Sequence, residues 1–294
     1  MKPVPLTFAE DRHVAIWGHE RWLVSAHPSA PSVVSGGPFA GRRLDDLCET
    51  LGTDLTGTLA RGNFPLLIKD IVAKCRLSMQ VHPNEVTCRT TGGEPKSELW
   101  HVLDAESGGV LFAGVRTGVT RQDLEKAISD GCIEDVVLRH DAVVGENVFV
   151  PGGLVHAIGG GVRVLEVQQS SDTTYRLYDW GRVDAEGRPR QLHVSEGLAA
   201  ADLNATPVIS RGDFACPYFK VCVLSPHAEM DVPADPGTFR VLVAAQGGFA
   251  LESDAGRQEI ATGCAVLVPA VVAATVIPFG DDIRLLEVSM RFMR

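Results

Sequence analysis

The sequence lacks the patterns that mark membrane, secreted and nucleic-acid-binding proteins. Its longest apolar runs, such as Cys264–Ile277, fall short of the roughly 20 residues that a membrane-spanning helix needs. The N-terminal segment Met1–His13 has no apolar core, so we expect no secretory signal. With 27 Lys and Arg against 37 Asp and Glu, the formal charge is −10. We therefore expect no membrane partner and no nucleic-acid partner.

Paired cysteines are missing too. The seven cysteines are scattered and no CxxC pair occurs, which argues against a disulfide framework and against a thiolate zinc site. We expect reduced cysteines in a cytoplasmic protein. The glycine triplet Gly159–Gly161 has neither a GxxxxGK nor a GxGxxG context, so it predicts a tight turn rather than a phosphate loop.

Short apolar runs between turn residues dominate what is present. The chain has 30 glycines and 17 prolines, and runs rich in Val, Leu and Ile lie between them, a pattern typical of strands. The clearest runs are Phe64–Val72, Val110–Val115, Val148–Val150, Val162–Val167, Phe239–Ala245 and Ala265–Pro269. Helical periodicity is convincing only over Arg121–Ser129, between a Thr120 cap and Gly131, and over Ser195–Leu203, with Ser195 as the expected cap. The sequence predicts a mainly β fold with a few short helices.

The chain also repeats itself. Gly145–Pro151 recurs as Gly263–Pro269, and the β-rich segment Arg163–Val167 recurs in the same order as Arg284–Val288. Two related β units follow, each expected to form a β-barrel or jelly roll. His156 of the first copy corresponds to Ala274 of the second. A metal or catalytic role would then belong to the first unit alone.

Polar residues alternate along the predicted strands of the first unit. Gln80 and His82 are two residues apart, as are Lys96 and Glu98, so each pair lies on one side of its strand. If Gly159–Gly161 closed a hairpin, His156 would share a face with Glu166 and also with Gln168.

Two imidazoles with carboxylate and amide oxygens form a ligand set for zinc or another borderline divalent cation. Each of these residues taken alone is more often a core or surface residue than a ligand. The other histidines have no such partners at this spacing, and we expect structural or surface positions for His13, His19, His27, His101, His140, His193 and His227.

Several long motifs stand in one order along the chain: Trp22–Pro28, Phe64–Lys69, Gln80–Asn84, Lys96–Trp100, His156–Trp180 and Pro189–His193. In this order they resemble the type I phosphomannose isomerases, in their short bacterial form. The resemblance implies two cupin-type jelly-roll β-barrels. The first is a metal-binding catalytic domain at residues 1–208, with a short helical insertion near 120–135. The second is a metal-free, cupin-like domain at residues 209–294.

The resemblance further implies an aldose–ketose isomerase that interconverts mannose 6-phosphate and fructose 6-phosphate through a metal-stabilised enediol(ate). The expected partner is a small sugar phosphate, and the expected assembly is a monomer or small homo-oligomer. The family's ligand motifs fall on Gln80, His82, Glu98 and His156, which would hold one zinc ion per chain. The chain departs from the family at Asn84-Glu85, where many relatives carry two aspartates.

The resemblance assigns catalytic roles to Arg176, Lys96 and Glu166. Arg176 would stabilise developing negative charge or hold the substrate, although a buried pair with Asp172 or Asp179 is the structural alternative. Lys96 would supply positive charge, and Lys69 is a further candidate for the phosphate.

The proton carrier stays open between Glu166 and a metal-bound water. Glu287 occupies the place that matches Glu166 in the second repeat, so a structural role in the strand is equally supported. Two other functions also remain possible on sequence alone, a cupin oxygenase with iron and a non-enzymatic sugar-binding or regulatory cupin.

Overall fold

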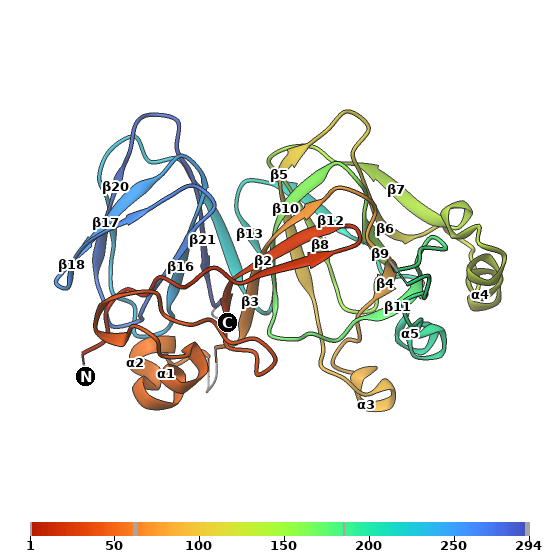
Figure 1. The fold of residues 1–294 in the computed structure, drawn as a ribbon, viewed down its shortest axis with the longest axis horizontal. Coiled ribbons are helices and arrows are strands. Elements are labelled where there is room, and N and C mark those ends of the chain that lie inside the picture. Colours follow the sequence, from red (N-terminus) through yellow and green to blue (C-terminus); the bar gives the residue numbers. More distant parts are fainter. Residues whose placement is uncertain (1, 61–63, 185, 292–294) are drawn as a thin grey trace. The chain divides into compact units, whose positions relative to one another are not determined.

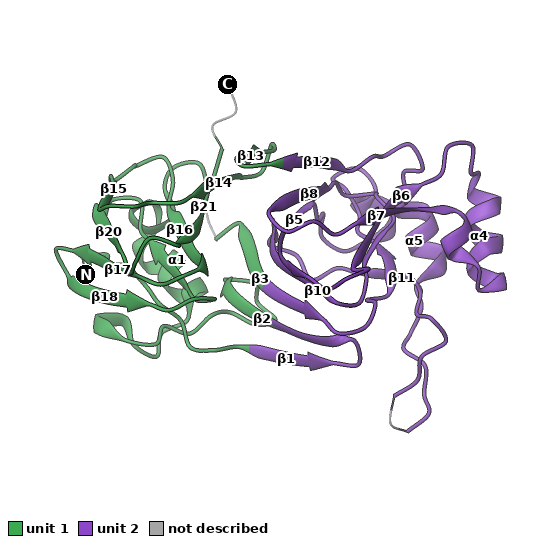
Figure 2. Cartoon of the chain, turned by 90° about the horizontal axis from the view of Figure 1, so that it is seen from above, with its two compact units in different colours: residues 1–11, 21–69, 211–294 green, residues 12–20, 70–210 purple. Residues whose placement is uncertain are grey.

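The computed structural model describes residues 2–60, 64–184 and 186–291, and it is mainly β (Figure 1). The chain forms two compact units, coloured separately in Figure 2. Unit 1 contains residues 1–11, 21–69 and 211–294, and unit 2 contains residues 12–20 and 70–210. The predicted class, mainly β with a few short helices, is confirmed.

The two units divide the chain differently from the predicted boundary at residue 208. Residues 21–69 belong to the unit that contains the C-terminal segment. Within that unit, the backbone N–H groups of Thr58 and Leu59 each donate at 3.0 Å to the carbonyls of Pro236 and Gly237. These long-range bonds leave no local signal in the sequence, and the division into domains stays a prediction.

The strands of the first repeat form two sheets (Figure 1). The seven-stranded sheet has the order β1 (Arg12–Ala15), β2 (Gly18–Ser25), β3 (Leu66–Ala73), β10 (Val162–Gln169), β5 (Glu98–Ala105), β8 (Glu146–Val150) and β12 (Val208–Arg211). The five-stranded sheet has the order β11 (Tyr175–Tyr178), β4 (Met79–Val81), β9 (His156–Ile158), β6 (Val110–Val115) and β7 (Val137–Asp141).

The second repeat also forms two sheets. One has the order β13 (Phe214–Ala215), β14 (Lys220–Leu224), β21 (Arg284–Ser289), β16 (Arg240–Gln246) and β19 (Ala265–Val268). The other has the order β15 (Met230–Val232), β20 (Ala274–Pro278), β17 (Phe249–Ser253) and β18 (Gly256–Ile260). The repeated sequence blocks therefore form equivalent strands, β8 with β19 and β10 with β21.

The helices are short: α1 (Leu44–Leu51), α2 (Thr53–Thr56), α3 (Cys88–Thr91), α4 (Arg121–Asp130), α5 (Val194–Ala200), and the 3-10 turns η1 (Gly37–Phe39) and η2 (Ile133–Asp135). The prediction for α4 is confirmed, because Thr120 and Asp123 form a capping box and Gly131 ends the helix with φ 73°. The cap predicted for α5 was wrong: the helix begins at Val194, and Ser195 lies inside it. Within the described residues, no helix is long and apolar enough to cross a membrane.

The hairpin predicted across Gly159–Gly161 does not form. β9 pairs with β4 and β6, whereas β10 pairs with β5, so the glycines carry the chain from one sheet to the other. A Cβ on Gly159 would lie 2.4 Å from the carbonyl oxygen of Val110, which explains why this crossing needs glycine. His156 therefore reaches the barrel interior from the sheet opposite Glu166.

Candidate active site

Strand ends place the two histidines. β4 carries Gln80 and ends at Val81, since Pro83 has no N–H for the ladder. His82 stands between them. Gly153, with φ 98°, turns the chain before β9 and donates its N–H to the carbonyl of His82 at 2.8 Å. His156 opens β9.

Cross-strand register completes the site. In the five-stranded sheet, Gln80 is paired with His156 on one side and with Arg176 of β11 on the other. In the seven-stranded sheet, Glu98 of β5 is paired with Gln168 of β10. Directly paired residues have Cβ atoms about 4.5–5.5 Å apart. The two sheets thus direct imidazole, carboxylate and amide groups into one barrel.

His82, Glu98 and His156 form a buried cluster. One ligand atom from each residue lies within 4.8 Å of the other two. The two Nε2 atoms are 3.2 Å apart, and the Glu98 oxygens lie 3.3 Å from His82 Nε2 and 3.4 Å from His156 Nε2. None of the three is more than 1% exposed. Gln80 borders the cluster, with its amide nitrogen 3.3 Å from His156 Nε2.

The backbone fixes which imidazole nitrogens carry hydrogen. Nδ1 of His82 is 2.8 Å from the carbonyl oxygen of Thr173, and Nδ1 of His156 is 2.8 Å from that of Leu154. A carbonyl oxygen only accepts, so each neutral ring carries its hydrogen on Nδ1 and directs an Nε2 lone pair into the cluster. This tautomer is the one that ligates a metal through Nε2.

Burial sets the charges of the cluster. It lowers the pKa of His82 to about 3, with Lys96 acting in the same direction and Glu98 against it. It also lowers the pKa of His156. For Glu98, burial alone would raise the pKa, but Lys96 and the two histidines outweigh it and hold the pKa well below the ordinary value. Both imidazoles are neutral at pH 7, and Glu98 is ionised.

These groups fit a divalent cation. Neither Glu98 oxygen accepts a hydrogen bond of ordinary geometry from the residues that the structure describes. Two facing Nε2 lone pairs beside an anionic carboxylate repel one another unless positive charge lies between them. Two imidazoles and a carboxylate suit zinc, and a metal would also take the amide oxygen of Gln80. In the structure that oxygen accepts from Ser78, and the amide nitrogen is the Gln80 atom nearest to His156 Nε2, at 3.3 Å.

Lys96 brings a positive charge to the edge of this cluster. Its Nζ lies 2.8 Å from Glu98 Oε2, 3.2 Å from His82 Nε2 and 4.0 Å from Glu166 Oε1. Burial alone would lower the pKa of Lys96, but Glu98 and Glu166 outweigh it and raise the pKa, so the ammonium stays charged. The predicted residues Lys96 and Glu166 therefore lie beside the cluster.

Arg176 lies next to the cluster and does not adopt the structural alternative. Its Nε donates to Ser78 Oγ at 3.3 Å, and Ser78 Oγ donates to Gln80 Oε1 at 3.3 Å. Its Nη1 donates to the carbonyl of Gln191 at 2.8 Å. Among the described residues, neither Asp172 nor Asp179 forms an ion pair with it. Burial lowers the pKa of Arg176, and the neighbouring Arg190 lowers it further.

The remaining predicted positions have other contacts. Lys69, the further phosphate candidate, lies over the ring of Trp22 at 4.7 Å from its centroid. Gln168 is buried, and its amide donates to the carbonyls of Gln169 and Ser171. His193 was expected to be a structural or surface residue, and its Nδ1 accepts from the backbone N–H of Arg176 at 3.3 Å.

Two residues beside the site were missed in the sequence. Ser78 joins Arg176 to Gln80, and the indole N–H of Trp100 donates to Glu166 Oε2 at 3.0 Å. Both residues stand two positions from a predicted ligand, Ser78 before Gln80 and Trp100 after Glu98, which in a strand means the same side. That spacing was a usable signal for both.

The second repeat, in unit 1, has no such cluster among the described residues, and its strands show why. Val268, which repeats Val150, is paired with Arg240, whereas Val150 is paired with Glu98. An arginine thus takes the place of the carboxylate. Ala274 takes the place of His156, as the sequence repeat predicts. The result is an ion pair, with Arg240 Nε 3.2 Å from Glu287 Oε1.

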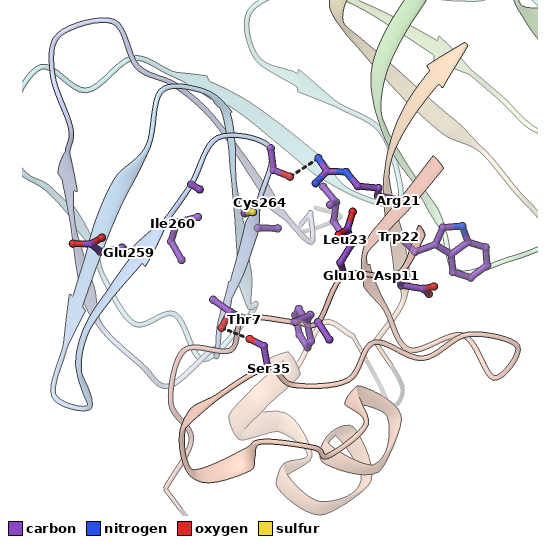
Figure 3. A pocket seen from close by; sticks show the side chains of 15 residues that line it. Thr7, Glu10, Asp11, Arg21, Trp22, Leu23, Ser35, Glu259, Ile260 and Cys264 are labelled. Atoms are coloured by element: carbon purple, nitrogen blue, oxygen red, sulfur yellow. Dashed lines mark hydrogen bonds between the residues drawn. The ribbon is translucent and has the colours of Figure 1, made fainter. Parts of the chain in front are cut away.

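Unit 1 does contain a pocket of about 350 Å³, shown in Figure 3. Thr7, Ser35, Arg21 and Cys264 are among its lining residues. Arg21 donates to the carbonyl of Gly263 at 2.9 Å, and the hydroxyls of Thr7 and Ser35 lie 2.8 Å apart. Its described lining includes none of the predicted metal ligands, which all lie in unit 2.

Comparisons with known proteins identify the family of the chain. A family model, the catalytic domain of type I phosphomannose isomerase, matches residues 7–107. A mannose-6-phosphate isomerase of Streptococcus mutans is 35% identical over 225 residues, which are 69% of this chain and 71% of that protein. The chain belongs to the type I phosphomannose isomerase family. The predicted family and its aldose–ketose isomerase activity are thereby confirmed.

Solved structures extend the likeness to the phosphomannose isomerase fold as a whole. The crystal structure of the mannose 6-phosphate isomerase from Bacillus subtilis superimposes with a TM-score of 0.86 at 27% identity, covering 98% of this chain and 99% of that one. A zinc-bound mannose 6-phosphate isomerase has a TM-score of 0.72 at 16% identity, covering 98% and 100%. The second likeness concerns the fold alone.

Proposed function

We propose that this phosphomannose isomerase interconverts mannose 6-phosphate and fructose 6-phosphate at a single zinc ion bound by Gln80, His82, Glu98 and His156. The observation that carries the proposal is the convergence of two Nε2 lone pairs and a buried carboxylate within 4.8 Å of one another. Zinc accepts this donor set and has no redox chemistry, which suits an isomerisation. A related fold with bound zinc supports the choice of metal.

The reaction moves one hydrogen from C2 to C1 of the open-chain sugar and one from O2 to O1. A carbon-bound hydrogen beside a carbonyl is too weakly acidic to leave at neutral pH without help. A bound divalent cation would supply a Lewis acid that polarises the carbonyl oxygen.

Charged side chains on two sides of the cluster would bind the substrate and its developing charge. The buried ammonium of Lys96 lies beside Glu98, and the guanidinium of Arg176 is linked to Gln80 through the hydroxyl of Ser78. Both cations match the anionic phosphate and the oxygens that gain negative charge during the reaction.

Glu166 would move the carbon-bound proton. It is 3% exposed, its Oε2 is held by Trp100, and its Oε1 lies on the side of Lys96. A carboxylate in this position takes the proton from C2 of the aldose and returns it to C1 of the ketose, as a general base and then a general acid. We also infer a cytoplasmic location, which the seven unpaired cysteines support.

Metal removal tests the proposal directly. The purified protein should convert mannose 6-phosphate to fructose 6-phosphate in a coupled assay without oxygen uptake. Removing the metal with a chelator should abolish the conversion, and zinc should restore it at one ion per chain, measured by elemental analysis.

Two results would contradict the proposal. Full activity in protein shown to be free of metal would remove the metal from the reaction. Iron-dependent oxygen uptake without sugar isomerisation would identify the cluster as an oxygenase site, because two histidines and one carboxylate also suit non-haem iron.

A further inference from the structure

The carboxylate of Glu166 is held by a donor that carries no charge. Glu166 of β10 is directly paired with Trp100 of β5, and the indole N–H of Trp100 donates to Glu166 Oε2 at 3.0 Å. Both residues are almost fully buried, at 3% and 1% exposure. Because the pairing is fixed by the ladder and the indole is enclosed by the core, the carboxylate is fixed by the fold rather than by a flexible side chain.

The indole ring also contacts the metal cluster. The ring of Trp100 meets the ring of His156 edge to face, with centroids 5.5 Å apart. One rigid side chain therefore contacts both the carboxylate and a proposed metal ligand. The other Glu166 oxygen, Oε1, is the one that faces Lys96 at 4.0 Å.

The second repeat shows what a charged donor does at the same place. Glu287 matches Glu166, and its direct partner is Leu242 where Glu166 has Trp100. Leucine has no N–H. Glu287 is instead bound by the guanidinium of Arg240. A guanidinium stabilises the ionised carboxylate and makes it a poor proton acceptor, whereas an indole donates one hydrogen bond and leaves the charge in place.

We propose that Trp100 is a positioning residue for proton transfer: its indole N–H fixes Glu166 Oε2 so that Oε1 faces the substrate as the proton acceptor. The proposal rests on the proposed isomerase function and names a residue outside the metal ligands. In the second repeat the matching carboxylate, Glu287, is held by Arg240, and a leucine stands in the place of Trp100.

Removing the indole N–H donor is the sharpest test. Trp100→Phe should lower kcat by about 10- to 100-fold, because misplacing a catalytic group by about 1 Å costs about that much. KM should change by less than about three-fold, and the metal content should stay unchanged. Replacement of Trp100 by the isosteric benzothienylalanine, which has sulfur in place of the N–H, keeps the packing and should give the same loss. This second variant decides the question if Trp100→Phe fails to fold.

Trp17→Phe is the matched control. Trp17 belongs to the same core cluster as Trp100 and is 8% exposed, but it lies between β1 and β2 rather than on β5 beside Glu166. It should keep the wild-type kcat. A Trp100 variant that folds, binds metal and retains wild-type kcat would overturn the proposal.

A double-mutant cycle separates positioning from general support of the fold. If Trp100 acts through Glu166, then Trp100→Phe should cost less than about two-fold in a Glu166→Gln background. Losses that multiply would overturn the proposal.

An NMR readout is independent of turnover. The indole N–H resonance that disappears in Trp100→Phe should shift in Glu166→Gln and stay in place in Glu287→Gln, its counterpart in the second repeat. An unshifted resonance in Glu166→Gln would overturn the positioning role even if the wild-type protein is active. An inactive wild-type protein with the expected shift would refute the proposed function and, with it, the catalytic use of this contact.

Discussion

At the scale of single residues, the position of a hydrogen decides what the site can do. The carbonyls of Thr173 and Leu154 take the Nδ1 hydrogens of His82 and His156, so both Nε2 lone pairs face Glu98. Were either tautomer reversed, an N–H would point into the cluster and exclude a cation. The metal site therefore depends on two backbone oxygens that are not ligands.

Arg176 provides the test at this scale. Arg176→Ala should lower kcat by about 100- to 1000-fold, the usual cost of losing one group that stabilises transition-state charge. The zinc content should be unchanged, because no proposed ligand is altered. Arg188→Ala, which removes an exposed arginine paired with Asp184 and Glu186, should keep wild-type kinetics. Near-normal turnover of Arg176→Ala with bound zinc would disprove the role given to Arg176.

At the scale of elements, the segment after β11 is secured by one carboxylate. Asp179 is 6% exposed and accepts hydrogen bonds from Arg182 and Arg190. The next residue, Trp180, has φ 59°, a left-handed conformation that costs energy in a residue other than glycine. The same segment returns to present the carbonyl of Gln191 to Arg176.

Asp179→Asn should destabilise the fold in a pH-dependent way. Burial alone would raise the pKa of Asp179, but Arg190 and Arg182 outweigh it and lower the pKa. A lowered pKa stabilises the fold at pH values above the ordinary carboxyl value of about 4, and this stabilisation is lost as the pH falls through the folded pKa. The difference in unfolding free energy between wild type and variant should be full at pH 7 and shrink below about pH 4, in denaturant titrations.

The exposed pair at the tip of the same segment is the control. Asp184 and Arg188 are 3.0 Å apart in solvent, so Asp184→Asn should change stability much less than Asp179→Asn does. A constant difference between wild type and Asp179→Asn from pH 7 to pH 3 would show that the ion pairs do not account for the stabilisation.

At the scale of the whole molecule, the two β repeats carry different side chains at equivalent positions. The first repeat directs His156 and Glu98 inward, and the second has Ala274 and Arg240 at the equivalent places. A guanidinium already balances Glu287 there. The second barrel thus neutralises its carboxylate internally and needs no ion.

Metal stoichiometry tests this division. His156→Ala should abolish stoichiometric zinc, whereas Arg240→Ala should retain about one zinc per chain, because the proposed ligands all lie in the first repeat. Elemental analysis of dialysed protein measures both. Residual stoichiometric zinc in a folded His156→Ala variant would place the ion elsewhere.

The sequence by itself determined the features that depend on residues close together in the chain. Alternation placed Gln80 with His82 and Lys96 with Glu98, because the side chains of a strand change sides at every residue. The capping residues of α4 and the repeated blocks were equally local. The motif order from Gln80 to Trp180 predicted the family, and the comparisons confirm it.

Only the tertiary structure decided which of these groups meet. Sequence reasoning paired β9 with β10, but a glycine crossing sends them to different sheets. It did not decide whether Arg176 contacts the substrate or pairs with an aspartate. In the fold, Asp179 accepts hydrogen bonds from Arg182 and Arg190 instead. It missed the contact of Trp100 with Glu166. Side-chain alternation along a strand and helix caps depend on residues that are close in the sequence. The pairing of strands depends on packing between segments far apart in the chain, and that pairing decided which side chains meet in the site.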